Sequence, residues 1–163
     1  MLVLGIDPGV ATTGYGFITQ KPDGSIYAVN YGIIQTKPGI CLSDRLLILH
    51  SELKQLLLLH HPASAAVEKL FFQRNVSTAI SVGEARGICL LALAQEKIPI
   101  GEYTPLEVKQ AVTGYGMADK HQVQSMVKTL LQLDKIPQPD DAADALAIAI
   151  CHLNHNNYYQ ATL

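Results

Sequence analysis

Short apolar runs that end in turn-forming residues dominate the first part of the chain. Residues 1–7 form one such run and lead into Asp-Pro-Gly, a pattern typical of a strand followed by a turn. Residues 13–20 and 25–36 also have strand-like patterns, and the Lys-Pro-Asp-Gly between them favours a tight turn. The pattern therefore predicts three strands in succession, of which the second and third form a hairpin.

After residue 40, apolar positions recur mostly at the helical spacing, with two short buried runs between them. The expected elements are a helix at 42–61, a strand at 63–70, a helix at 75–97, a strand at 98–103 and helices at 105–112, 119–133 and 140–155. Thr-Pro-Leu-Glu at 104–107 has the composition of a capping box with proline at the first helical position. Asp119 is expected to cap the next helix. No linker or change in composition divides the series.

The order of elements predicts one α/β domain over residues 1–157 and a short flexible tail at 158–163. The 163 residues are enough for a proper core, and 48% hydrophobic with 16% charged residues indicates a globular chain. Polar residues interrupt every apolar stretch before it reaches the length of a membrane span, and the N-terminus has no secretory pattern. We therefore expect a cytoplasmic protein with no membrane association.

The number of cysteines and the net charge bear on which kinds of site the chain could carry. Cys41, Cys89 and Cys151 are odd in number and far apart, which argues against a disulfide framework or a cysteine-rich zinc site, so we expect three buried thiols. The net charge of −2 gives little sign of nucleic-acid binding. However, more than half of the twelve basic residues lie between residues 69 and 128, which leaves room for a local basic face.

Four carboxylates stand in otherwise apolar sequence: Asp7 and Glu68 end strand-like runs, and Asp141 and Asp144 share one face at the start of the last helix. Each has an ordinary explanation by itself, as a turn cap, a solvent-facing strand end or a charge favouring the helix dipole. Asp140 fits the dipole explanation best. The set as a whole suggests convergence, and repelling carboxylates of this kind suit a pair of divalent ions and phosphodiester chemistry.

Other polar and aromatic residues leave alternatives open. Phe71 and Phe72, with Arg74 nearby, form either a core aromatic pair or a loop that stacks on an unpaired base while its basic neighbours hold phosphates. Lys109 and Lys120 flank the glycine-containing loop at 113–116, where a solvated surface is the simpler explanation. His152 and His155 have a spacing that could bind a metal, although a solvated helix end is favoured.

Taken in order, these pieces resemble the RuvC-type Holliday junction resolvases, the crossover junction endodeoxyribonucleases. The match runs over nearly the whole chain. The residues that carry it are Gly5-Ile6-Asp7-Pro8-Gly9, Thr13-Gly14-Tyr15-Gly16, Val67-Glu68 with Phe71 and Asn75, Gly83-Glu84-Ala85-Arg86-Gly87, Val108-Lys109-Gln110, Lys120 with Gln122-Val123-Gln124 and Met126-Val127, and the run from Asp141 to Ala147. The first motif alone is weak, because sugar kinases carry similar strings, but the ordered set is specific.

The resemblance implies a ribonuclease-H-like fold, with a five-stranded mixed sheet flanked by helices on both faces. It implies that the four acids bind two Mg²⁺ ions, with Mn²⁺ as a substitute, and that Lys120 is also catalytic. Phe71 would stack on a base at the junction centre, with Phe72 as the alternative ring. Lys109 and Lys120 would contact the region of the scissile phosphate.

The implied function is resolution of four-way DNA junctions in recombination and repair, by paired symmetric nicks that leave 5′-phosphate and 3′-hydroxyl ends. Two nicks require two sites, so a two-fold homodimer is expected, with helix 75–97 in its interface. The RuvA–RuvB branch-migration complex is the implied partner. The alternatives are another ribonuclease-H-like nuclease or a junction-binding module without catalysis; an actin-like ATPase would need a second domain, for which the chain is too short.

Overall fold

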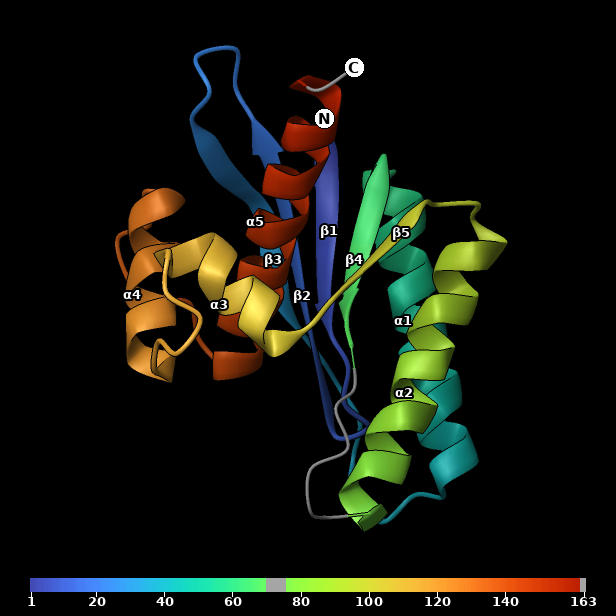
Figure 1. Ribbon diagram of the computed structural model, residues 1–163. Helices are drawn as coiled ribbons and strands as arrows, with labels where there is room; N and C mark the ends of the chain where they lie inside the picture. Colours follow the sequence, from blue (N-terminus) through green and yellow to red (C-terminus); the bar gives the residue numbers. More distant parts are fainter. Residues whose placement is uncertain (70–75, 162–163) are drawn as a thin grey trace.

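The computed structural model describes residues 1–69 and 76–161 and contains five strands and five helices in this part of the chain. Their order confirms the predicted series (Figure 1). The bounds are β1 Leu2–Asp7, β2 Thr12–Gln20, β3 Ile26–Gln35, α1 Leu42–His60, β4 Ser64–Glu68, α2 Val76–Gln95, β5 Ile100–Tyr103, α3 Pro105–Thr113, α4 Lys120–Leu130 and α5 Asp140–Ala161.

The five strands form one mixed sheet in the order β3-β2-β1-β4-β5. The β1–β2 and β2–β3 pairs are antiparallel, whereas β4 pairs parallel with both β1 and β5. In the β1–β4 ladder Ile6 lies opposite Val67, so the next residues, Asp7 and Glu68, end adjacent strands at the same edge of the sheet. The register therefore brings two of the four candidate acids together.

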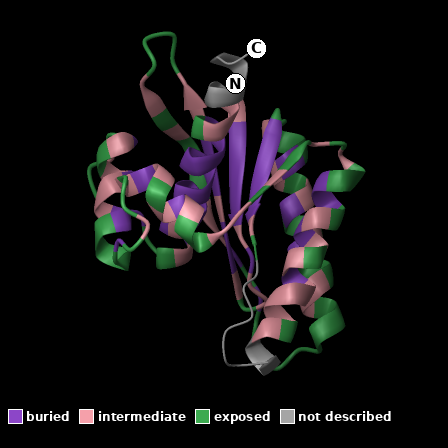
Figure 2. Ribbon diagram, viewed as in Figure 1, coloured by how far each residue is buried: buried purple, intermediate pink, exposed green. Residues whose placement is uncertain are grey.

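Helices cover both faces of the sheet (Figure 1). On one face α1 and α2 pack against alternate residues of the central strands, including Leu4, Ile6 and Phe17. On the other, α5 with α3 and α4 packs against the intervening residues, such as Val3 and Ile18. The central strands and the inner face of α5 are the most deeply buried elements (Figure 2). The predicted ribonuclease-H-like architecture is confirmed.

The predicted start signals of two helices act as expected. The Thr104 side chain accepts from the backbone N–H of Glu107, whose carboxylate accepts from the backbone N–H of Thr104, and Pro105 opens α3. Asp119 caps α4 and forms a reciprocal box with Gln122. These local hydrogen bonds satisfy N–H groups that lack helical partners, which explains why the sequence marks these two helix starts so clearly.

Three expectations about boundaries and burial need correction. β5 begins at Ile100 rather than residue 98, because Pro99 has no N–H for the ladder, although its carbonyl accepts from Ala65. α5 continues to Ala161, beyond the predicted end at residue 155. Cys89 and Cys151 are buried, but Cys41 is exposed because it precedes α1 in a surface loop.

Among the described residues, no helix is long and apolar enough to cross a bilayer.

Candidate active site

The four candidate acids lie on three elements that meet at one edge of the sheet. Asp7 ends β1 and Glu68 ends the adjacent strand β4. Asp141 and Asp144 lie in the first turns of α5, the helix that packs across β1 and β2. Asp7 also pairs across the ladder with Gly14 of β2. A strand pair and a helix start therefore supply all four carboxylates.

Gly14 allows the start of α5 to lie almost directly on the sheet. A Cβ atom at this position would lie 1.9 Å from the main-chain oxygen of Asp141, well inside any tolerable contact. Because Gly14 is the ladder partner of Asp7, the same glycine adjoins both the strand acid and the helix acid. The missing side chain is thus what lets β1 and α5 bring their acids close together.

The electrostatics show that the acids act on one another. The pKa of Asp7 is raised to about 8, first by burial and then by the negative charges of Glu68, Asp144 and Asp141. Burial also raises the pKa of Glu68, with a further contribution from Asp144. The pKa of Asp144 is raised by burial, although Lys120 opposes the shift. The site therefore concentrates negative charge that the protein compensates incompletely.

This excess of carboxylate oxygen fits divalent cations such as Mg²⁺ and Mn²⁺, which prefer such ligands. In the part of the chain that the structure describes, however, no three acidic, histidine or cysteine side chains are already grouped closely enough to hold an ion. The donor chemistry and the raised pKa values agree with a metal site. Its ligand set stays a prediction from the sequence.

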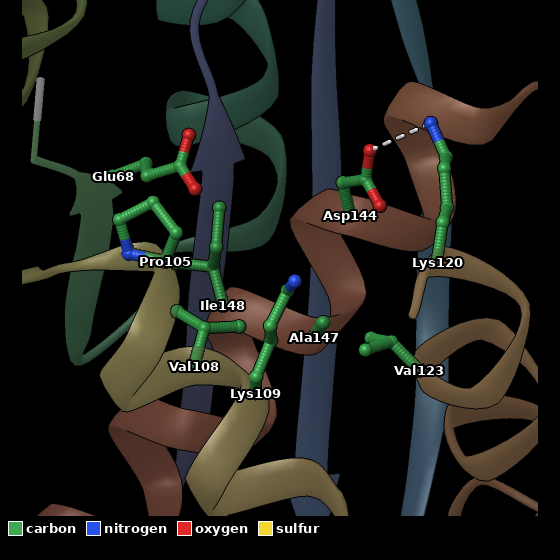
Figure 3. A pocket seen from close by; sticks show the side chains of 9 residues that line it. All are labelled: Glu68, Pro105, Val108, Lys109, Lys120, Val123, Asp144, Ala147 and Ile148. Atoms are coloured by element: carbon green, nitrogen blue, oxygen red, sulfur yellow. Dashed lines mark ion pairs between the residues drawn. The ribbon is translucent and has the colours of Figure 1, made fainter. Parts of the chain in front are cut away.

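A cavity of about 220 Å³ opens beside Glu68 and Asp144. Two lysines line it, Lys109 from α3 and Lys120 from the first residue of α4 (Figure 3). In Figure 3 the Lys109 amino group extends into the cavity between the two carboxylates. The family resemblance implies that these lysines contact the region of the scissile phosphate, which stays a prediction; the fold brings both to the wall of the acid-lined cavity.

Lys120 is held by two acids of α5. Its Nζ lies 3.0 Å from Asp140 Oδ2 and 3.3 Å from Asp144 Oδ2. Burial acts to lower its pKa, but hydrogen bonds and charge from Asp140 and Asp144 leave the pKa raised. Gln124 Nε2 donates to the other Asp140 oxygen at 3.0 Å. Asp140 therefore orients the lysine, which agrees with its omission from the predicted ligands.

Arg86 and Gln124 are two supporting residues for which the sequence analysis predicts no role of their own. The Arg86 Nε donates to the main-chain oxygen of Glu68 at 3.1 Å, and its guanidinium pairs with Glu102 of β5. Arg86 thus fixes the strand end that carries Glu68. Both residues occur within the motifs of the family resemblance, but their partners are distant in sequence, so local patterns could not reveal these contacts.

The predicted base-stacking residues Phe71 and Phe72, and the predicted phosphate contact Arg74, lie outside the described residues. Their segment connects Lys69, directly after the Glu68 strand end, to the start of α2.

The expectation of a solvated helix end at His152 is wrong. His152 is 5% exposed, because α5 continues past it and lays this face against β4 and β5. Its two ring nitrogens lie 2.9 Å from Tyr103 Oη and 2.9 Å from Ser64 Oγ. Burial, and then the charge of His155, lowers the pKa of His152 to about 4. His152 is therefore a hydrogen-bonded core residue and no metal ligand of the acid site.

Comparison with known proteins gives a consistent result. The family model described as "Crossover junction endodeoxyribonuclease RuvC" matches residues 3–152. A protein of that name from Caldicellulosiruptor saccharolyticus is 53% identical over 153 residues, covering 94% of this chain and 92% of its own. One from Desulfitobacterium hafniense is 54% identical over 157 residues, covering 96% and 94%.

Among solved structures, Thermus thermophilus RuvC in complex with a Holliday junction substrate superimposes with a TM-score of 0.91 at 35% identity. The match covers 97% of this chain and 96% of that one. The yeast mitochondrial Holliday junction resolvase Ydc2 shares the fold, with a TM-score of 0.65 at 18% identity. The sequence and structural matches, each spanning nearly the full length, establish that this chain belongs to the RuvC family of crossover junction endodeoxyribonucleases.

Proposed function

We propose that the chain is a metal-dependent endonuclease that resolves four-way DNA junctions by paired symmetric nicks, as a homodimer. The observation that carries the proposal is the cluster of electrostatically coupled acids at the ends of β1, β4 and the start of α5, beside a cavity lined by two lysines. Acids alone would repel DNA. Once the acids have bound divalent ions, the site with its two flanking lysines would attract a phosphate.

The residues divide into two roles. Asp7, Glu68, Asp141 and Asp144 would hold two divalent ions, which when bound supply activation of a water nucleophile and stabilisation of the leaving 3′-oxygen. Lys120, oriented by Asp140 and Asp144, places a fixed positive charge at the cavity wall, and Lys109 places a second one. Both lysines would draw the scissile phosphate into the cavity and offset its developing charge.

Phe71, with Phe72 as the alternative, is proposed to stack on an unpaired base at the junction centre, and Arg74 to hold a nearby phosphate. The segment that carries them follows Glu68 by only a few residues, which favours a role beside the scissile bond. The products would carry 5′-phosphate and 3′-hydroxyl ends. We further propose Mg²⁺ as the ion used, a cytoplasmic location, and cooperation with the RuvA–RuvB complex.

The proposal is tested by incubating the protein with a synthetic four-way junction in Mg²⁺, in Mn²⁺ and in EDTA. We expect paired, symmetric nicks with either ion and none in EDTA. A linear duplex of the same sequence is the control substrate and should be cut far more slowly. Cleavage of the duplex as readily as the junction would refute junction specificity, and binding without cleavage in any metal would instead indicate a non-catalytic junction-binding module.

The homodimer is supported by an apolar stripe along α2. Four exposed residues lie at helical spacing on its outer face: Ile80, Gly87, Leu91 and Ala94. The glycine and alanine would allow a second helix to approach closely, while the two larger side chains would supply apolar area. This agrees with the predicted interface along helix 75–97.

Replacing Leu91 with Asp should therefore convert the dimer to a monomer. Leu91 is 49% exposed within one chain, so the change costs little in the isolated fold but would bury a charge in the interface. Light scattering after size exclusion measures the mass. Leu106→Asp is the matched control, because Leu106 is 58% exposed on α3, across the sheet. A Leu91→Asp protein that stays dimeric would exclude this face.

A further inference from the structure

A second cavity, of about 450 Å³, lies on the other side of the α5 acids. The turn after β1, the start of α1 and part of α2 enclose it, and its lining includes Gly9, Arg45, Ser81 and Asp141. Asp144 lines the lysine cavity described above, whereas Asp141 lines this one. The pair of acids on α5 therefore stands between two cavities; two lysines line the first, and Arg45 lines the second.

Arg45 is held in place through one edge of its guanidinium. Its Nε donates to Thr36 Oγ1 at 2.8 Å, and the Thr36 hydroxyl donates to the main-chain oxygen of Val10 at 2.6 Å. Thr36 is 4% exposed, and its N–H donates to Ala11 O at 3.0 Å, so this anchor belongs to the folded core of the turn. The side chain is thereby ordered before any ligand arrives.

Arg45 forms no ion pair with any other residue that the structure describes. In residues 1–69 and 76–161, no carboxylate lies within ion-pair distance of it, although Asp141 lines the same cavity. Three of the other basic residues near the acids or on α1 do have acidic partners: Lys120, Arg86 and Lys54. An anchored guanidinium with a free terminal edge is the group best suited to bind a phosphate.

We propose that Arg45 binds a backbone phosphate of the cleaved DNA strand, next to the scissile phosphate and on the side away from Lys109 and Lys120. This rests on the proposed function. A DNA strand whose scissile phosphate lies at the acids must continue away from the site in both directions. On the lysine side it meets two cations; on the other side its next phosphate would enter the cavity that Asp141 and Arg45 line. Arg45 supplies positive charge in the wall of that cavity, so it would bind this phosphate and fix the direction of the strand.

Junction binding in EDTA, measured over a series of KCl concentrations, tests the assignment without cleavage. Arg45→Gln keeps an amide that can donate to Thr36 but removes the charge. We expect it to weaken binding several-fold at low salt and to reduce the slope of log K against log salt by roughly 0.9 for each protomer that engages DNA. Arg45→Lys, which retains the charge, should keep most of the wild-type slope.

Two further variants separate charge from structure. Thr36→Val removes the anchor but leaves the charge, and Lys54→Gln removes a charge from the same helix outside the cavity. Both should keep the wild-type slope. An unchanged slope in Arg45→Gln, with wild-type protein binding normally, would overturn the inference, as would equal loss in Thr36→Val. If the wild-type protein bound the junction neither in EDTA nor with Ca²⁺ in its place, the proposed function itself would fall, and the phosphate site with it.

Discussion

Asp7→Asn should abolish junction cleavage while junction binding persists. The negative charges of all three other acids raise the pKa of Asp7, and its carboxylate lies at the end of the central strand. Asparagine keeps the shape and one oxygen but removes the charge that a divalent ion requires. We expect the rate of nicking to fall on the order of 10³-fold or more, about 4 kcal/mol of barrier. Gel assays of nicking and of binding in EDTA measure the two properties separately.

The same substitution should stabilise the metal-free protein, increasingly so as pH rises. The unfolded pKa of Asp7 is near 3.8 and the folded pKa is about 8, so the folded state holds this proton more tightly. The associated stability is complete below pH 3.8 and is lost as pH rises through 8. Asparagine has no proton to lose. At pH 8 the substitution should therefore raise the free energy of unfolding by at most about 5 kcal/mol, and each kcal/mol raises Tm by roughly 2–4 °C.

Thermal unfolding in EDTA across this pH range checks the stability effect. Asp134→Asn serves as the control, because Asp134 is exposed in the loop after α4 and its loss should change Tm little at any pH. Adding Mg²⁺ should raise the Tm of the wild-type protein more than that of Asp7→Asn, since binding stabilises the folded state. Loss of junction binding together with cleavage, or a Tm difference independent of pH, would contradict the assignment of Asp7.

Some of these features could be predicted from the sequence, because their causes are local. The capping boxes at Thr104 and Asp119 depend on residues three apart, and the strand that ends at Asp7 is set by its own apolar run and turn. The acids could be nominated because ionised groups in apolar sequence need an explanation. Their roles came from the family resemblance, which the comparisons confirm at the level of the family.

The supporting contacts could not be predicted, because each joins residues far apart in the chain. Arg86 meets Glu68 only because α2 packs against β4, and His152 meets Ser64 only because α5 covers the sheet. The burial of His152 illustrates this: a separation of three residues from His155 occurs equally on a solvated and on a buried helix face, so the spacing does not reveal burial. Whether a polar side chain is a ligand, an anchor or surface depends on the opposing element, which local periodicity does not identify.

Gly14→Ala should nearly abolish cleavage although it changes no candidate catalytic residue. The new methyl group would lie 1.9 Å from the main-chain oxygen of Asp141, and backbone at this point cannot rotate away as a side chain could. α5 must therefore shift outward and take Asp141 and Asp144 with it, while Asp7 stays on its strand. A displacement of about 1 Å at a reacting centre lowers rates on the order of 10²-fold. The overpacking itself costs about 3 kcal/mol, or roughly 6–12 °C in Tm.

A control that is strained but distant from the acids distinguishes lost geometry from lost stability. Gly24 lies in the hairpin turn between β2 and β3 with φ of 86°, and no atom lies within 4 Å of where its Cβ would be. Gly24→Ala should thus cost about 1 kcal/mol of strain and leave the nicking rate at the wild-type value. If Gly14→Ala were destabilised yet nicked junctions normally below its Tm, the close approach of α5 to β2 would serve packing alone. If it lost nicking at temperatures where it is fully folded, that approach is what places the helix acids opposite Asp7.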